Sequence, residues 1–205
     1  MRFFQRDRVE PFLAKIDIER LREIQRRYAD STDRYAKYAD VERWLKINLP
    51  RVRELKLDRP PPKHILDLGC GAGFFLFLAT QFRHSGLGLD LDDFPLSNEL
   101  IALFGIERVT SRIHAFQSLP DFDGKFDLIT AFSVAFNRNE DESRGWNIEE
   151  WKFFLDDLDR HLAPGGRIFL EINSGKDKRY FPAEIREFFL KRGARVSGER
   201  VSFGT

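Results

Sequence analysis

Short apolar runs along this chain alternate with longer stretches in which apolar positions recur at helical spacing. The short runs predict buried strands, and the longer stretches predict helices with one polar face. The predicted strands cover residues 65–68, 86–90, 112–116, 126–132 and 167–172, with a final strand or hairpin at 194–203, and the predicted helices cover 74–82, 95–104, 149–162 and 182–192. This alternation indicates a parallel sheet with helices on both faces, so the expected fold is α/β and doubly wound.

The first 58 residues follow a different pattern, because they are highly charged and helical in character. A rough apolar stripe joins residues 13–28, and a cleaner one joins 41–55, where Asn48 is the polar exception. Pro50 is expected to kink or divide that second helix. We interpret residues 1–58 as a helical cap or lid, with a partner-binding helix as the alternative. Arg59 and three prolines then form a stiff linker, and residues 63–205 are expected to form the main domain.

Composition limits the classes of protein that the chain can represent. Its 205 residues suffice for one well-buried α/β core, and 34 basic against 33 acidic residues argue against an electrostatic nucleic-acid binder. No apolar run approaches the roughly 20 residues needed to cross a bilayer, so no membrane association is expected. The single cysteine, Cys70, excludes an internal disulfide, which favours the cytoplasm. The 21 phenylalanines predict a core packed on aromatic rings.

A glycine-rich turn follows the first predicted strand, with the sequence Ile-Leu-Asp-Leu-Gly-Cys-Gly-Ala-Gly-Phe over residues 65–74. Glycines adopt backbone angles closed to other residues and let a ligand approach the main chain, and the N-terminus of the following helix attracts a carboxylate. A dinucleotide fingerprint requires its third glycine at position 74, which here is Phe74, and the Gly-Lys-Ser/Thr of a phosphate-binding loop is missing. The turn therefore predicts a different ligand at the carboxyl ends of the strands.

The turn resembles motif I of the class I S-adenosylmethionine-dependent methyltransferases, in which a strand ends in Asp-x-Gly-x-Gly-x-Gly. Asp67, Gly69, Gly71 and Gly73 match this motif. The resemblance implies S-adenosyl-L-methionine as the cofactor and a Rossmann-like methyltransferase fold, a doubly wound, mostly parallel sheet that carries the N-terminal helical cap.

Further segments support the resemblance, which covers roughly residues 63–192. Residues 126–129 resemble the fourth strand of the family, and residues 162–168 resemble its turn into the fifth strand. Members of the family usually close with an antiparallel hairpin. Here that hairpin is expected to be either very short, around Ser197 and Gly198, or missing.

The resemblance also implies roles for single positions. Gly69 and Gly71 line the methionine half of the cofactor, and Asp90, at the end of the second strand, accepts the ribose hydroxyls. Many relatives place an Asp after the third strand, but Ala115 and Phe116 stand there, so the backbone N–H of Phe116 is expected to hold the adenine. The expected cofactor-binding residues are Asp67, Gly69, Cys70, Gly71, Gly73, Asp90, Leu91 (against the adenine), Phe116 and Phe132 (just past the fourth strand, on the methionine side).

The remaining reactive side chains show no sequence pattern that indicates catalysis or metal binding. Cys70 is interpreted as a small loop residue, because no histidine lies nearby in sequence to activate it as a nucleophile. Asp127 begins a strand and is interpreted as structural, and His161 as packing or capping. The remaining histidines, His64, His84 and His114, lack metal-ligand spacing, so no metal is expected.

The acceptor of the methyl group is not evident from the sequence, and no catalytic base can be named. Asn137, after the fourth strand, and the cap residues Tyr35 and Tyr38 are candidate acceptor contacts, and Asn173 has a weaker claim. Signatures of DNA methyltransferases are missing, so a small-molecule acceptor is expected, with a protein side chain as the alternative. A non-catalytic S-adenosylmethionine-binding sensor or partner subunit also remains open, as does a pure interaction module.

Overall fold

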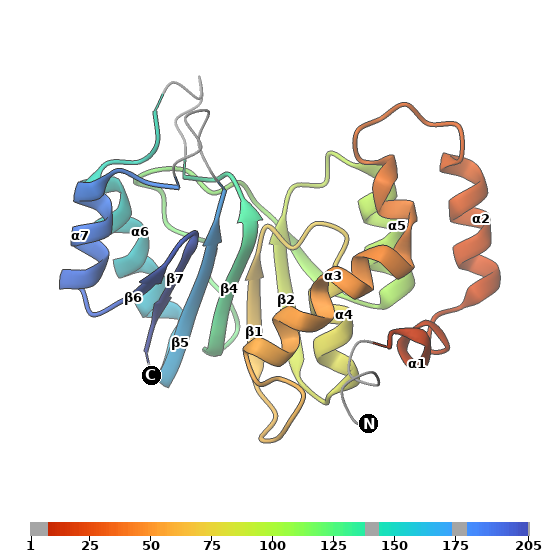
Figure 1. The fold of residues 1–205 in the computed structure, drawn as a ribbon, viewed down its shortest axis with the longest axis horizontal. Helices are drawn as coiled ribbons and strands as arrows, with labels where there is room; N and C mark the ends of the chain where they lie inside the picture. The colour runs from red at the N-terminus through yellow and green to blue at the C-terminus, as the bar shows by residue number, and fades with distance from the viewer. Residues whose placement is uncertain (1–7, 138–143, 174–179, 205) are drawn as a thin grey trace. The chain divides into compact units, whose positions relative to one another are not determined.

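The computed structural model describes residues 8–137, 144–173 and 180–204 (Figure 1). The chain divides into two compact units, of which the first comprises Met1–Lys63 and Cys70–Thr110, and the second comprises His64–Gly69 and Ser111–Thr205. The chain crosses from the second unit to the first within the glycine-rich turn.

The first unit contains the N-terminal helices and two parallel strands. Its elements are α1 (Glu10–Leu13), α2 (Ile18–Tyr28), the 3₁₀ helix η1 (Ala36–Ala39), α3 (Val41–Glu54), α4 (Phe74–Gln81), β2 (Ser85–Asp90), α5 (Pro95–Phe104) and β3 (Glu107–Thr110). Helix α4 packs against α3 and β2, and its residues from Phe74 to Ala79 are all buried. A helix that is apolar on every side needs cover on every side, which explains why α3 lies against it.

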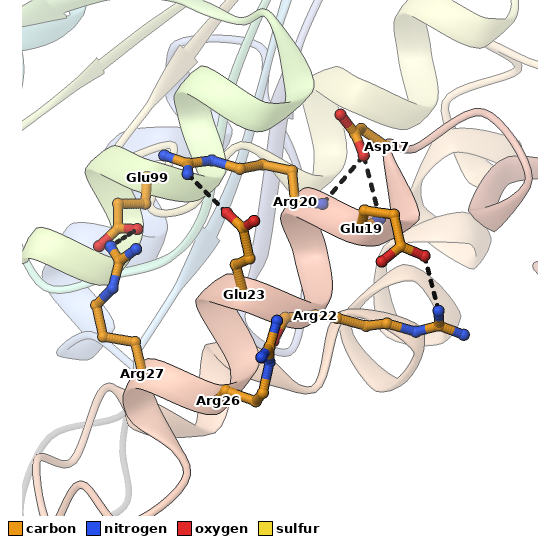
Figure 2. Close-up of polar contacts among 8 residues, drawn as sticks. All are labelled: Asp17, Glu19, Arg20, Arg22, Glu23, Arg26, Arg27 and Glu99. Carbon is orange, nitrogen blue, oxygen red and sulfur yellow. Dashed lines mark hydrogen bonds and ion pairs between the residues drawn. The ribbon is translucent and has the colours of Figure 1, made fainter.

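The helices α2 and α3 each bury one face. In α2, Leu21 and Ile24 are buried, while the opposite face carries ion pairs between Arg20 and Glu23 and between Arg22 and Glu19, as Figure 2 shows. The carboxylate of Asp17 caps the helix by accepting the backbone N–H groups of residues 19 and 20. The outer ion pairs are solvent-exposed, so the buried face supplies most of the packing energy.

Helix α3 continues through Pro50, so this residue does not divide the helix, and the expected kink stays a prediction. Pro50 removes one N–H donor, but both Pro50 and Lys46, whose carbonyl would accept it, are exposed, and water can satisfy that carbonyl. The polar exception Asn48 is buried and donates its amide N–H to the carbonyl of Trp44, at 2.9 Å. This local bond makes a buried amide compatible with an otherwise apolar face.

The second unit contains the other five described strands and two helices. They are β1 (His64–Leu68), β4 (Phe126–Val134), α6 (Ile148–His161), β5 (Leu162–Ile172), α7 (Ala183–Lys191), β6 (Arg195–Ser197) and β7 (Arg200–Phe203). Strands β1, β4 and β5 pair in parallel, and β7 joins antiparallel to β5 and to β6. The strand order is β3-β2 in the first unit and β1-β4-β5-β7-β6 in the second. The mostly parallel, doubly wound class predicted from the sequence is confirmed.

The closing hairpin is present and very short. Strands β6 and β7 are joined around Gly198, whose φ of +58° is favourable for glycine in a tight turn. Aromatic rings fill the interior of this unit, as the phenylalanine content predicts, and the fully buried ones are Phe126, Trp151, Phe154 and Phe189.

Three strand predictions need correction. Strand β5 begins at Leu162 rather than at residue 167, because Leu162 already pairs with Phe126 of β4, before a shift in the register of the two strands. The third strand is β3 at Glu107–Thr110, and residues 112–116 form no strand. Gly105 ends α5 in a left-handed conformation and returns the chain at once, so that pairing with β2 begins at Glu107. Strand β4 extends to Val134, so Phe132 lies within the strand rather than just past it. No helix of the described residues is long and apolar enough to cross a membrane.

Candidate functional site

The glycine-rich turn has a left-handed backbone at its three glycines, with φ of +68° at Gly69, +56° at Gly71 and +78° at Gly73. The N–H of Gly73 donates to the carbonyl of Cys70 at 2.9 Å and closes the turn, and Gly73 is also the N-cap residue of α4. Such φ values are strained for any residue with a side chain, so this turn depends on glycine at each position.

The glycines differ in what surrounds them. A Cβ at Gly69 would lie 2.4 and 2.7 Å from the two methyl carbons of Val134, whereas a Cβ at Gly71 would meet nothing within 4 Å. Gly69 is therefore required by packing within the second unit, and Gly71 leaves its backbone open to a ligand. Gly88 on β2 makes room for Cys70, because a Cβ there would lie 2.5 Å from its sulfur.

The carboxylate of Asp90, at the end of β2, is held by two backbone donors. Its Oδ2 accepts the N–H of Gly71 at 2.6 Å, and its Oδ1 accepts the N–H of Leu91 at 2.7 Å. Each carboxylate oxygen offers two acceptor positions, so both oxygens retain one for a ligand hydroxyl. Asp90 is therefore fixed to the glycine turn and still able to bind a pair of hydroxyl groups.

Aromatic side chains of the N-terminal segment lie in the same unit as these residues. The ring of Tyr38 contacts Trp44 and Phe74, the first residue of α4, with centroids 4.7 and 6.3 Å away. The ring of Tyr35 contacts Tyr38 and Phe94, which precedes α5. Burial raises the pKa of Tyr38, with further contributions from Tyr35 and Asp90, so its hydroxyl stays protonated at neutral pH. The structure thus places Tyr38 near Asp90 and the start of α4, and places Tyr35 beside Tyr38 and Phe94.

Two carboxylates of the second unit are held by the strands around them. Asp67 on β1 is buried, and its Oδ1 accepts the hydroxyl of Thr130 on β4 at 2.7 Å. Asp127 accepts the backbone N–H of His64 at 2.7 Å, in line with its structural interpretation. The contribution of Thr130 was missed in the sequence, although a polar residue within the apolar run of β4 is the signal that could have revealed it.

Residues at the end of β4 and after β4 and β5 make hydrogen bonds that hold this edge of the second unit. Ser133 has a φ of +56°, and its carbonyl accepts the side-chain amide of Asn173 at 2.5 Å. Asn137 is buried, and its carbonyl accepts the N–H of Trp146 at 2.8 Å. Both asparagines therefore have structural contacts, and their predicted roles toward an acceptor remain predictions.

Phe116 lies in the loop after β3 with a φ of +58° and an exposed fraction of 58%. Its ring contacts Phe153 of α6 edge-on, and the two rings border a surface pocket of about 260 Å³ in the second unit. A left-handed conformation is uncommon for a bulky residue. The expected role of its N–H toward adenine remains a prediction.

The histidines whose contacts are described have structural surroundings. His84 is buried, its Nδ1 accepts the N–H of Lys63 at 3.0 Å, and its Nε2 lies 2.7 Å from the carbonyl of Leu57. His161 packs edge-on against Phe122, and burial lowers its pKa. Within the described ranges, no group of three or more His, Cys, Asp or Glu side chains could hold a metal ion.

Comparison with known proteins identifies the family. Residues 21–203 match the family described as "Methyltransferase domain". Among solved structures, Streptomyces venezuelae DesVI is similar over 79% of this chain and 91% of its own, with 14% identity and a TM-score of 0.55. An O-methyltransferase family protein from Burkholderia thailandensis is similar over 90% of this chain and 66% of its own, with 17% identity and a TM-score of 0.51. No curated protein matches.

The chain belongs to this methyltransferase domain family and, by its glycine turn, to the class I S-adenosylmethionine-dependent methyltransferases. The solved structures bear on the fold alone, and the chain spans about half to two thirds of the length of several of them. S-adenosylmethionine is the cofactor of this class. The open space over Gly71 leaves room for the methionine half of such a cofactor, and the fixed carboxylate of Asp90 retains acceptor positions that fit its ribose.

Proposed function

We propose that this protein transfers the methyl group of S-adenosylmethionine to an oxygen, nitrogen or carbon of a small-molecule acceptor. The observation that carries the proposal is the bond between the N–H of Gly71 and the carboxylate of Asp90, at 2.6 Å, beside an unobstructed backbone. A nucleoside lying across the strand ends needs both a hydroxyl acceptor and a close approach to the main chain.

The cofactor, once bound, supplies an activated methyl group on a sulfonium, and the residues of the chain align it with the acceptor. Asp90 would accept the ribose hydroxyls, Leu91 would contact the adenine, and the backbone N–H of Phe116 would donate to the adenine. Gly69 and Gly71 would line the methionine half, to which Asp67 and Phe132 would also contribute. Alignment of this kind lowers the barrier of a direct displacement by several kcal/mol.

The near balance of charge supports a small molecule rather than a nucleic acid as the acceptor. In the cap, the faces of Tyr35 and Tyr38 suit a planar or cationic group, since Arg34 already lies 4.6 Å over one ring and Lys37 lies 5.4 Å over the other. We therefore assign Tyr35 and Tyr38 to the acceptor side of the site, with Asn137 as a further contact.

Calorimetric titration tests the choice of cofactor. S-adenosylmethionine and its demethylated product are expected to bind at micromolar levels, about −8 kcal/mol, because the glycine spacing suits an adenosyl ligand. NAD serves as the control ligand in the same titration. Binding of NAD together with no binding of either adenosyl ligand contradicts the proposal. Cofactor binding without turnover over a broad panel of acceptors favours a non-catalytic sensor instead.

The cap tyrosines can be tested by removing only their hydroxyl groups. Tyr35→Phe and Tyr38→Phe keep the ring packing, so donor affinity should change little, while acceptor affinity and turnover fall in at least one variant. Steady-state kinetics with both substrates checks this.

Tyr28→Phe is the matched control for the cap tyrosines. Its hydroxyl, at the end of α2, donates to a carboxylate oxygen of Glu99 on α5 at 2.9 Å. Loss of this bond loosens the cap without changing the two candidate rings. Kinetic constants equal to those of the unmodified protein in both Tyr35→Phe and Tyr38→Phe would exclude a role of the two hydroxyl groups in binding the acceptor.

A further inference from the structure

The turn between β2 and α5, residues 91–94, directly follows the expected ribose residue Asp90 and has no regular secondary structure. Leu91 donates its N–H to Asp90, so the position of this turn sets the orientation of the carboxylate. The side chains of Asp92 and Asp93 are exposed. Hydrogen bonds from neighbouring elements are therefore needed to fix the conformation of the turn.

One such hydrogen bond comes from the side-chain amide of Asn98, in the first turn of α5. Its Nδ2 donates to the backbone carbonyl of Asp92 at 2.9 Å. Its Oδ1 accepts from Nη2 of Arg108, on β3, at 2.7 Å. Because the guanidinium can only donate and the carbonyl can only accept, the two partners allow just one orientation of the amide.

The guanidinium of Arg108 contains a buried nitrogen whose hydrogen-bonding capacity is unsatisfied among the described residues, which lowers the stability of the fold. Its Nη1 is fully buried and meets no hydrogen-bond acceptor in the part of the chain that the structure describes. A buried donor without an acceptor destabilises the folded state, so stability alone does not explain an arginine here. Its stem lies over Gly88, where an added Cβ would be 3.6 Å from the Cγ of Arg108 and 2.5 Å from the sulfur of Cys70. The side chain of Arg108 thus lies close to Gly88 and to Cys70 of the glycine turn.

We propose that Asn98, oriented by Arg108, is a positioning residue for the ribose of the methyl donor. It fixes the carbonyl of Asp92 and thereby the turn that presents the carboxylate of Asp90 and the N–H of Leu91. The proposal rests on the proposed function, in which Asp90 accepts the ribose hydroxyls. Asn98 and Arg108 act through the turn.

The test uses the full chain and S-adenosylhomocysteine as the calorimetric probe. Asn98→Leu removes both bonds at similar volume, and Asn98→Asp keeps an acceptor for Arg108 but loses the donor to Asp92. Both are expected to weaken binding about five- to tenfold, the loss of roughly one to two hydrogen bonds. Arg108→Lys, which keeps a donor, should bind more tightly than Arg108→Met. In kinetics, the KM for the donor should rise while kcat changes little.

The same substitution in an Asp90→Ala background separates positioning from general destabilisation. If Asn98 acts through Asp90, Asn98→Leu should cost little further affinity there, whereas an equal loss in both backgrounds overturns the proposal. Unchanged affinity in folded Asn98→Asp and Arg108→Met variants overturns it as well, even if Asn98→Leu does not fold. Failure of the unmodified protein to bind any adenosyl ligand would instead reject the proposed function.

Discussion

Asp90→Ala is expected to weaken S-adenosylmethionine binding by about 30-fold or more while the fold persists. In the proposed site the substitution removes two charge-assisted hydrogen bonds to the ribose, together worth on the order of 2 kcal/mol or more. The N–H groups of Gly71 and Leu91 lose their acceptor, but Asp90 is only partly buried, and water can take its place. Calorimetry gives the affinity, and circular dichroism checks the fold.

Glu107→Ala is the matched control for Asp90→Ala. Glu107 is an exposed acid on β3 of the same unit, so its removal changes the net charge equally without touching the turn. Its affinity for the donor should equal that of the unmodified protein. A folded Asp90→Ala variant with unchanged affinity would mean that another group holds the ribose.

Gly69→Ala is expected to reduce the free energy of unfolding by about 2–5 kcal/mol. The left-handed backbone costs roughly 1–2 kcal/mol for a residue with a Cβ, and overpacking adds roughly 1–3 kcal/mol, because the new Cβ lies within 2.7 Å of both methyl carbons of Val134. This is a large share of the roughly 5–15 kcal/mol that stabilises a typical domain. Denaturant unfolding measures the loss, and Val134→Ala in the same chain should recover part of it.

Gly71→Ala should reduce donor affinity more than it reduces the stability of the fold. The φ of +56° makes alanine strained there too, but no atom lies within 4 Å of the new Cβ, so the stability loss should be about 1–2 kcal/mol. The added methyl group instead stands in the space above the turn and should weaken donor binding. Equal stability losses in the two alanine variants would show that packing against Val134 does not distinguish these glycines.

The sequence predicted the elements whose signals are local. The apolar run of β1, the glycines after it and the fully apolar α4 are consecutive in the chain, so their order alone predicts a strand, a turn and a buried helix. The position of Asp90 at the end of β2 could be predicted from the short apolar run before it, and its role toward the ribose stays a prediction. Strand β3 was misplaced because its residues, Glu-Arg-Val-Thr, are half-exposed and give no alternating pattern, while residues 112–116 imitate one.

Features that depend on distant side chains could not be predicted. Asn98 reads as an ordinary polar residue of a helix, and only the fold brings it between the carbonyl of Asp92 and the guanidinium of Arg108. The left-handed backbone of Phe116 also has no sequence signal, since its residue type disfavours that conformation. Contacts between residues that are far apart in the sequence depend on how the elements pack. That packing cannot be derived from the local pattern of a single sequence.

The packing of Trp44 provides a tryptophan fluorescence signal that belongs to the first unit. The chain has three tryptophans, and Trp146 and Trp151 lie in the aromatic interior of the second unit. The indole of Trp44 instead stacks on Phe74 and donates its N–H to the carbonyl of Lys37, so its emission depends on how the cap lies against the start of α4. With the other two tryptophans replaced by phenylalanine, intrinsic fluorescence would report on the cap and the glycine turn separately from unfolding of the rest of the chain.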